Sequence, residues 1–223
     1  MSCLAEFATT HGRPAESVLR PYKFNKRGEG FARSRYYRQA ITAIRDYHSN
    51  QNDSKVLQIA LSELRARVDK ATDARERSKL CNNIKAIDAY HHIYRDRHFK
   101  VLPNHRVTYQ LGRIDITAQP DLWVEENGIQ ILLKIGVSKK KTSYVDILLT
   151  VMRKAAIANK HRIRAKNIVY LDVSSGRERI CNASLSHFNS TLNAKAKEIM
   201  NAWPKIKTAP PPTNANNRRT GDS

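Results

Sequence analysis

The sequence predicts an α/β fold, in which a helical region precedes a mixed sheet that is flanked by helices. Apolar residues recur with a helical period before Pro103, and the period changes to the alternation of β-strands after it. Strand-like and helix-like segments then follow one another to about residue 203, which is typical of α/β proteins. Because 40% of the residues are hydrophobic, the chain can bury a core, and this excludes a wholly disordered basic protein.

The first half of the chain divides into an arm and a helical region. Residues 1–30 contain scattered glycines and prolines with little periodicity, so we expect an irregular basic arm or a short helix with loops. In the region 31–103 we expect helices that pack on the core, because apolar side chains recur there at helical spacing. These expected helices are 32–49, 54–70 and 73–98. Asp53 and Ser54 offer an N-cap to the second helix.

The second half, 104–203, is the expected α/β core. Its expected strands are 105–111, 113–118, 120–125, 129–135, 168–173 and 179–182, and its expected helices are 142–159 and 185–203. Asn127 and Gly128 predict a two-residue type I′ hairpin turn, because both readily take the positive φ angles of that turn. The strand after the turn is apolar almost throughout, which predicts a central strand covered on both faces. Residues 204–223, rich in Pro and Asn, predict a disordered tail.

The charge of the chain predicts a polyanionic partner. The 40 Lys+Arg exceed the 20 Asp+Glu by twenty, and residues 139–166 contain nine basic residues against one acidic residue. A folded surface with this excess attracts phosphates, so we expect nucleic acid, with DNA favoured over RNA. An anionic lipid surface and a basic interaction module without a nucleic-acid role are left open. The expected contact residues are Lys139, Lys140, Lys141, Arg153, Lys154, Arg162 and Arg164, with Arg33 and Arg35 in a second basic run that is interleaved with aromatic residues.

Several other classes of protein have no support in the sequence. No stretch approaches the roughly 18 consecutive apolar residues of a membrane span, so we expect no membrane partner. The three cysteines are far apart and form no CxxC pair, which favours a reducing compartment. We therefore expect a cytoplasmic protein, and leave association with the nucleoid and a homodimer open. The glycine-rich motifs GxxxxGK[ST] and GxGxxG are absent, so nucleotide-driven and dinucleotide chemistry are not indicated.

Asp121 and Lys134 are the residues that suggest chemistry. The hairpin places a carboxylate and an ammonium on neighbouring strands, and phosphodiester cleavage uses carboxylates to hold Mg²⁺ and a lysine to activate water or balance charge. The order Pro120–Asp121, a hairpin-length gap and Lys134 resembles the PD-(D/E)XK nuclease superfamily, and the following helix and strand resemble its RecB-type exonuclease branch. This resemblance covers residues 105–182. It implies a restriction-endonuclease-like fold, with Asp121 as a ligand of Mg²⁺ or Mn²⁺ and Lys134 as a catalytic residue.

The chain departs from this family at Leu132, where the signature has Glu or Asp two residues before the lysine. Residues 130, 132 and 134 share one face of a strand, so Gln130 could offer the site an amide oxygen in place of the acid. Magnesium usually needs one or two carboxylates, and we therefore expect a degenerate catalytic centre on a fold retained for binding. Two alternatives stay open: purely structural roles for the two motif residues, and an active nuclease with a migrated carboxylate. The candidates for that carboxylate are Asp115, Asp146 and Asp172.

Overall fold

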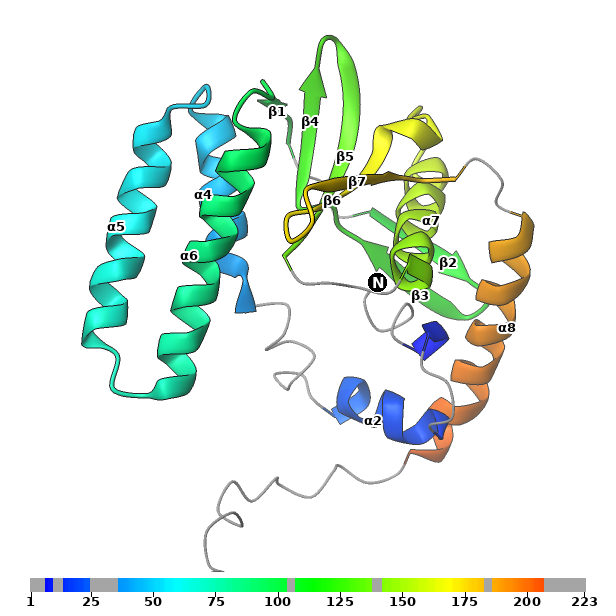
Figure 1. Ribbon diagram of the computed structural model, residues 1–223. Helices are drawn as coiled ribbons and strands as arrows, with labels where there is room; N and C mark the ends of the chain where they lie inside the picture. Colours follow the sequence, from blue (N-terminus) through cyan, green and yellow to red (C-terminus); the bar gives the residue numbers. More distant parts are fainter. Residues whose placement is uncertain are drawn as a thin grey trace, which may run out of the picture.

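The fold joins a bundle of helices to a five-stranded mixed sheet, as shown in Figure 1, a computed structural model. The structure describes residues 7–9, 14–24, 36–103, 107–137, 142–182 and 186–206. Its elements are α2 (Ala15–Phe24), α4 (Arg38–Ser49), α5 (Ser54–Lys70), α6 (Ala74–Tyr94), β1 (Lys100–Val101), β2 (Val107–Leu111), β3 (Ile114–Ala118), β4 (Leu122–Glu126), β5 (Ile129–Gly136), α7 (Thr142–Ala158), η1 (Ala165–Asn167), β6 (Ile168–Asp172), β7 (Arg177–Ile180), α8 (Ser186–Ala202) and η2 (Trp203–Lys205). The predicted α/β class is confirmed.

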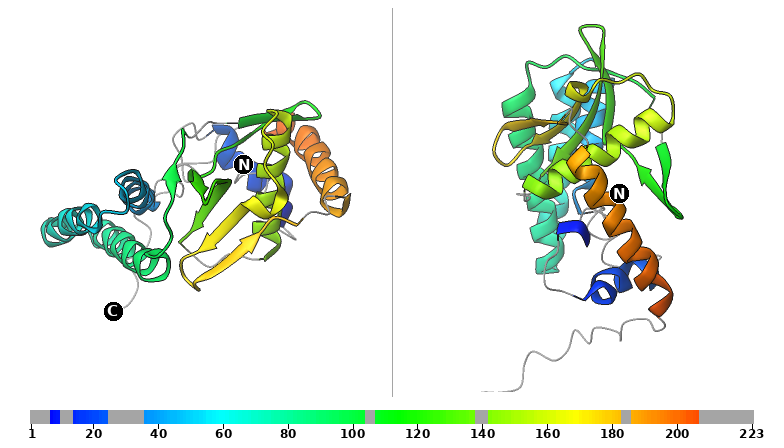
Figure 2. Two further views of the ribbon diagram at one scale, coloured as in Figure 1. Left: turned by 90° about the horizontal axis from the view of Figure 1, so that it is seen from above. Right: turned by 90° about the vertical axis from the view of Figure 1, so that its right-hand side faces the viewer.

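Helices α4, α5 and α6 form a bundle with a hydrophobic core of its own, which includes Leu57 and Leu80. The α5 helix begins where the sequence predicts, because the Asp53 carboxylate accepts a hydrogen bond from the backbone N–H of Lys55 at 2.9 Å. Asp73 caps α6 in the same way. Figure 2 shows this bundle on one side of the sheet and α7 and α8 on the other, so the sheet lies between two helical layers.

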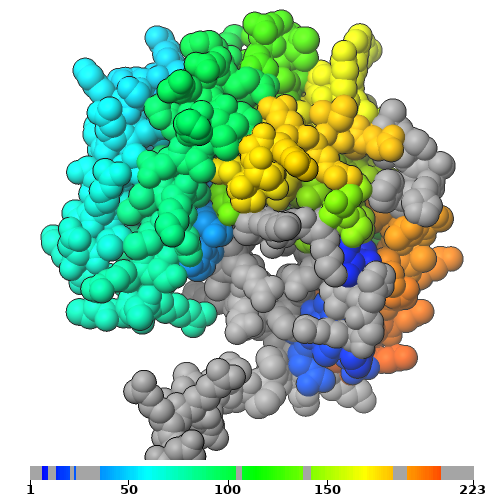
Figure 3. Space-filling model, viewed as in Figure 1, coloured from blue at the N-terminus to red at the C-terminus, as the bar shows by residue number. Residues whose placement is uncertain are grey.

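The sheet has the strand order β1-β4-β5-β6-β7. Strands β5 and β6 are parallel and are joined through α7, while the other neighbouring pairs are antiparallel. The predicted hairpin turn between β4 and β5 is confirmed: Asn127 and Gly128 have φ angles of 51° and 75°, and Glu126 pairs with Ile129. Strand β7 lies at an edge with its side chains exposed, and Figure 3 shows this part of the chain as a gold surface beside the bundle.

Strand β5 is central and is covered on both faces from Ile131 onward, as predicted. Leu133 and Ile135 pack with Ile44 and Tyr90 of the bundle on one face. Leu132 belongs to the cluster on the other face, which contains much of α7. The first two residues of the strand, Ile129 and Gln130, are exposed. The β4–β5 hairpin extends past the helices that cover the sheet at this end (Figure 1), and its tip is therefore accessible.

The two strands expected at 105–111 and 113–118 form a separate hairpin, β2–β3, instead of joining the main sheet. Val107, Tyr109 and Ile116 of this hairpin belong to the same apolar cluster as α7. Asn159, just after α7, donates a side-chain hydrogen bond to the Thr108 carbonyl at 3.0 Å. The hairpin thus forms a second layer over α7.

The two ends of the chain contain described elements: a short helix lies within the arm, as one of its two expected forms, and part of the expected tail is folded. The arm 1–30 contains the helix α2, whose Leu19 is buried in the main core together with Phe7. At the other end, the fold continues past residue 204, because η2 follows α8 and the side chain of Ile206 is buried. The remainder of the predicted tail, 207–223, lies outside the described residues. No described helix is both long enough and apolar enough to cross a membrane.

Candidate functional site

The structure brings Asp121 and Lys134 into direct contact. Lys134 Nζ donates to Asp121 Oδ1 at 2.7 Å, and the backbone N–H of Ile135 donates to Asp121 Oδ2 at 2.8 Å. The side chains of Asp121 and Lys134 are only 12% and 26% exposed. The lysine in this otherwise apolar strand is thus explained by a charge partner that precedes the neighbouring strand.

The backbone of Asp121 is also fixed by its surroundings. Its N–H donates to the carbonyl oxygen of Leu133 at 2.9 Å, and its own carbonyl accepts a hydrogen bond from Arg45 Nη2 at 2.8 Å. Arg45 belongs to α4, so this contact links the bundle to the start of β4. The carboxylate and the peptide of Asp121 therefore connect β5, α4 and the start of β4. This agrees with the structural role that the sequence leaves open for Asp121.

A row of polar side chains extends across the sheet from Lys134. Tyr170 of β6 pairs with Lys134, and Arg179 of β7 pairs with Tyr170. The Tyr170 ring lies against Gly136, where a Cβ atom would overlap the tyrosine hydroxyl, so a larger residue would require the ring to move. Burial raises the pKa of Tyr170, and the nearby charge of Asp172 raises it further, so the hydroxyl stays protonated.

Each of the three acids that could replace the missing metal ligand either has hydrogen-bonding partners of its own or lies in the other sheet. Asp146 of α7 binds Arg179, with Arg179 Nε at 2.8 Å from Asp146 Oδ1. Burial alone would raise the pKa of Asp172, but hydrogen bonds from Ser174 and the following serine outweigh burial and lower it. Asp115 lies on β3, in the other sheet, and is exposed.

The residues around Asp121 do not fit a Mg²⁺ or Mn²⁺ site. Leu132, at the position of the family's second acid, is 2% exposed and packs in the main core. In the part of the chain that the structure describes, no three His, Cys, Asp or Glu residues are grouped so that they could hold a metal ion. Both Asp121 carboxylate oxygens already accept hydrogen bonds. We therefore derive no metal-dependent step for this site.

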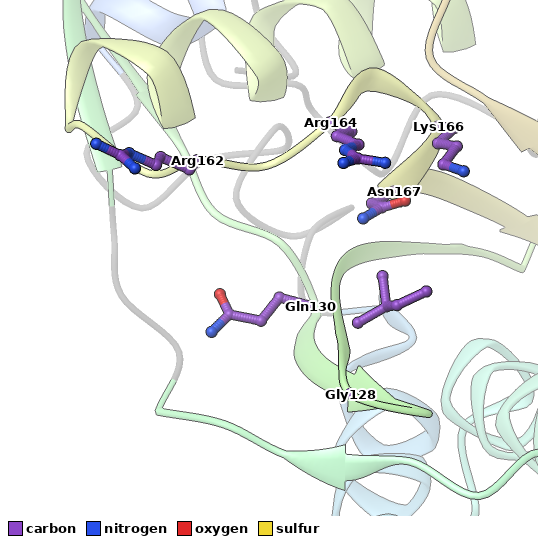
Figure 4. Close-up of a pocket in the computed structure, with 7 residues that line it drawn as sticks. Gly128, Gln130, Arg162, Arg164, Lys166 and Asn167 are labelled. Carbon is purple, nitrogen blue, oxygen red and sulfur yellow. The ribbon is translucent and has the colours of Figure 1, made fainter.

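A cleft of about 450 Å³ lies at the other end of β5, between the β4–β5 hairpin and the connection from α7 to β6. Gly128, Ile129 and Gln130 line it on the hairpin side, and Arg162, Arg164, Lys166 and Asn167 line it on the connection side. Figure 4 shows Arg164, Lys166 and Asn167 on the segment that faces the hairpin, with Arg162 further along the same segment. The cleft thus brings together residues more than thirty positions apart in the sequence.

The local sequence explains why basic side chains line this cleft. Burial alternates along the connection: Ile163 is buried in the main core, whereas Arg162 and Arg164 on either side of it are exposed. The ring of His161 packs edge-on against Trp123 of β4 at 4.7 Å between centroids, which holds the connection against the sheet. Ile163 and His161 thus anchor the segment, and Arg162 and Arg164 on either side of Ile163 stay exposed.

The charged side chains that line the cleft all carry a positive charge. Among the described residues that line it, three are basic and none is acidic. Within the described residues, the side chains of Arg162, Arg164 and Lys166 make no hydrogen bond or ion pair. Three neighbouring cations without counter-charges repel one another, and an anion bound between them would relieve that repulsion. The cleft is therefore suited chemically to phosphate groups.

Of the residues expected to bind nucleic acid and described by the structure, Arg162 and Arg164 line this cleft. Arg153 is half-buried and donates to the Asn182 carbonyl at 3.3 Å, and burial lowers the pKa of the half-buried Lys154. The other expected contacts, Lys139, Lys140, Lys141, Arg33 and Arg35, lie outside the described residues. The basic surface expected from 139 to 166 therefore stays a prediction, of which the cleft contains Arg162, Arg164 and Lys166.

Gln130 also differs from its expected position. It was expected to complete a site with Asp121 and Lys134, but it lines the cleft, and the buried Leu132 lies between it and Lys134 on the same face of β5. Sequence reasoning missed the hairpin wall of the cleft, and Asn167 beside it. The available signal was the alternation of Arg162 and Arg164 around the apolar Ile163, which indicates the outward side of an extended segment.

Comparison with known proteins identifies no relative of this chain. No protein-family model, no curated protein and no solved structure matches it. Its function is therefore argued from the geometry of the Asp121–Lys134 pair and of the basic cleft.

Proposed function

We propose that this protein binds nucleic acid in the basic cleft, and that its PD-(D/E)XK-like motif has a structural role in place of a catalytic one. The observation that carries the proposal is the cleft itself, whose charged lining consists of Arg162, Arg164 and Lys166. The net charge of +20 supports the same conclusion, because it provides long-range attraction to a polyanion. DNA as the preferred form of nucleic acid remains part of the proposal.

The order of elements supports a restriction-endonuclease-like fold as part of this proposal. Strand β4, the Asn-Gly turn, strand β5, helix α7 and strand β6 follow one another along the chain, as the resemblance implies. The three strands are neighbours in one sheet. This arrangement places Asp121 beside Lys134, while Leu132 occupies the position of the missing acid. The geometry therefore favours a nuclease-like scaffold without the ligands for metal-dependent cleavage.

A binding assay with two matched triple variants tests the proposal. In the first variant, Arg162, Arg164 and Lys166 are replaced by Gln. In the control, the exposed α5 residues Lys55, Arg65 and Lys70 are replaced by Gln, which removes the same charge from the bundle. Fluorescence anisotropy with labelled single- and double-stranded DNA and RNA should show a large loss of affinity for the first variant and a small loss for the control. Equal losses, or no binding by the wild type at moderate salt, would overturn the proposal.

The same oligonucleotides test the catalytic alternative. The wild-type protein is incubated with them in Mg²⁺, in Mn²⁺ or in EDTA, and the products are separated on a denaturing gel. We expect intact strands in all three conditions, because the residues around Asp121 do not provide a metal site. Metal-dependent cleavage that disappears in Asp121→Asn would establish an active nuclease and refute the structural role of the motif.

A further inference from the structure

The two walls of the basic cleft differ in chemistry. The connection wall carries three cations, Arg162, Arg164 and Lys166, whereas the hairpin wall contributes no charged side chain. On the hairpin wall the apolar side chain of Ile129 is 48% exposed, and Gln130 next to it is exposed as well. Among the described residues, the cleft thus has a cationic side and a hairpin side, where β5 offers the apolar side chain of Ile129 and, on its opposite face, the amide of Gln130.

A single nucleic-acid strand has the same asymmetry. Its phosphates lie on one side, and its unpaired bases offer apolar faces and hydrogen-bonding edges on the other. A duplex differs, because phosphate backbones border both sides of each groove and the base faces are stacked away from contact. The three cations also come from one short segment, in which Arg162 and Arg164 precede the 3-10 helix that contains Lys166, so they can contact neighbouring phosphates of one backbone.

The size of the cleft also favours a single strand over a duplex. Its volume of about 450 Å³ lies in the range of pockets that hold small ligands, and this leaves room for about one or two nucleotides. The major groove of a duplex is itself about 12 Å wide, so a whole duplex can touch the cleft only from outside. We infer that the cleft takes one strand of an unpaired nucleic acid, with phosphates on the cations and a base against Ile129. This inference rests on the proposed function and names its substrate class.

The test compares a single strand with a duplex on the wild-type protein and two Ile→Ser variants. The probes are a labelled 20-nucleotide oligothymidylate and a blunt 20-base-pair duplex at the same salt concentration. Ile129→Ser removes the apolar surface of the cleft, and Ile59→Ser on α5, where Ile59 is 61% exposed, is the matched control outside it. Both positions are exposed, so both variants should melt like the wild type, as circular dichroism can show.

We expect the single strand to bind about tenfold more tightly than the duplex, because only unpaired bases can contact the neutral wall. Ile129→Ser should weaken single-strand binding by about fivefold and leave duplex binding unchanged, while Ile59→Ser should change neither. Tighter binding of the duplex, or a loss of duplex affinity in Ile129→Ser, would overturn the inference but leave the proposed function intact, with the hairpin entering the major groove. If neither probe binds, the proposed function itself fails.

Discussion

Removing the three cations of the cleft should flatten the salt dependence of binding by an amount that the structure predicts. Each phosphate neutralised on a single strand contributes about 0.7 to the slope of log K against log salt, through counterion release. Arg162, Arg164 and Lys166 can neutralise three phosphates, so their replacement by Gln should reduce the slope by about 2. Between about 50 and 200 mM salt, the wild type should therefore lose about 16-fold more affinity than the variant.

The assay is a series of anisotropy titrations with labelled oligothymidylate at four or more KCl concentrations. The slope is measured for the wild type, the cleft variant and the control in which Lys55, Arg65 and Lys70 are replaced by Gln. The control tests for a general effect of net charge, because its three substitutions lie on α5, far along the chain from the cleft. Equal slopes for the wild type and the cleft variant would refute the reasoning, since the cations would then neutralise no phosphates.

Three further predictions concern the fold and the Asp–Lys pair. His48 is buried, its Nε2 lies 2.7 Å from Tyr90 Oη, and burial lowers its pKa from 6.5 to about 4. Because the unfolded chain takes up a proton below pH 6.5 and the native state does not, stability should fall by about 3 kcal/mol as the pH decreases from 6.5 to 4. Urea unfolding of His48→Gln should show a flatter pH profile than the wild type, and identical profiles would contradict this. Lys134→Met should cost about 2 kcal/mol of stability without changing nucleic-acid affinity, because it leaves the Asp121 charge without its cation, and adding Asp121→Asn should recover part of the loss. Ile206→Ala should cost about 3 kcal/mol in thermal or urea unfolding, because its side chain is buried, and wild-type stability would show that it does not pack in the core.

Local signals in the sequence predict the elements whose stability depends on nearby residues. The helix at 54–70 has the expected bounds, because Asp53 caps its N-terminus and apolar residues define one face. The hairpin after Glu126 also forms as expected, because Asn127 and Gly128 adopt the two positive φ angles that a type I′ turn requires. This turn fixes the register of β4 and β5, and the contact between Asp121 and Lys134 follows from it.

Features that depend on contacts between residues far apart in the sequence could not be predicted from local signals. The alternation in the strands β2 and β3 indicates their conformation, but it does not show that they pair with each other over α7. Likewise, the sequence of the basic run 139–166 does not show which of its described residues line the cleft. Arg153 on α7 donates a hydrogen bond to the Asn182 carbonyl, whereas Arg164 on the segment after α7 lines the cleft. The cleft depends on the pairing of β5 with β6, which brings the connection beside the hairpin.

The basic cleft and the nuclease-like motif lie at different ends of β5. Gln130 at one end lines the cleft, and Lys134 near the other end pairs with Asp121. Between them on the same face, Leu132 packs in the core, where an acid would meet an apolar environment and lose its solvation. A carboxylate at 132 would thus require a different core as well as a metal ion. Replacing Leu132 with Glu alone should therefore destabilise the fold without restoring cleavage, while the exposed cleft retains its affinity in the protein that remains folded.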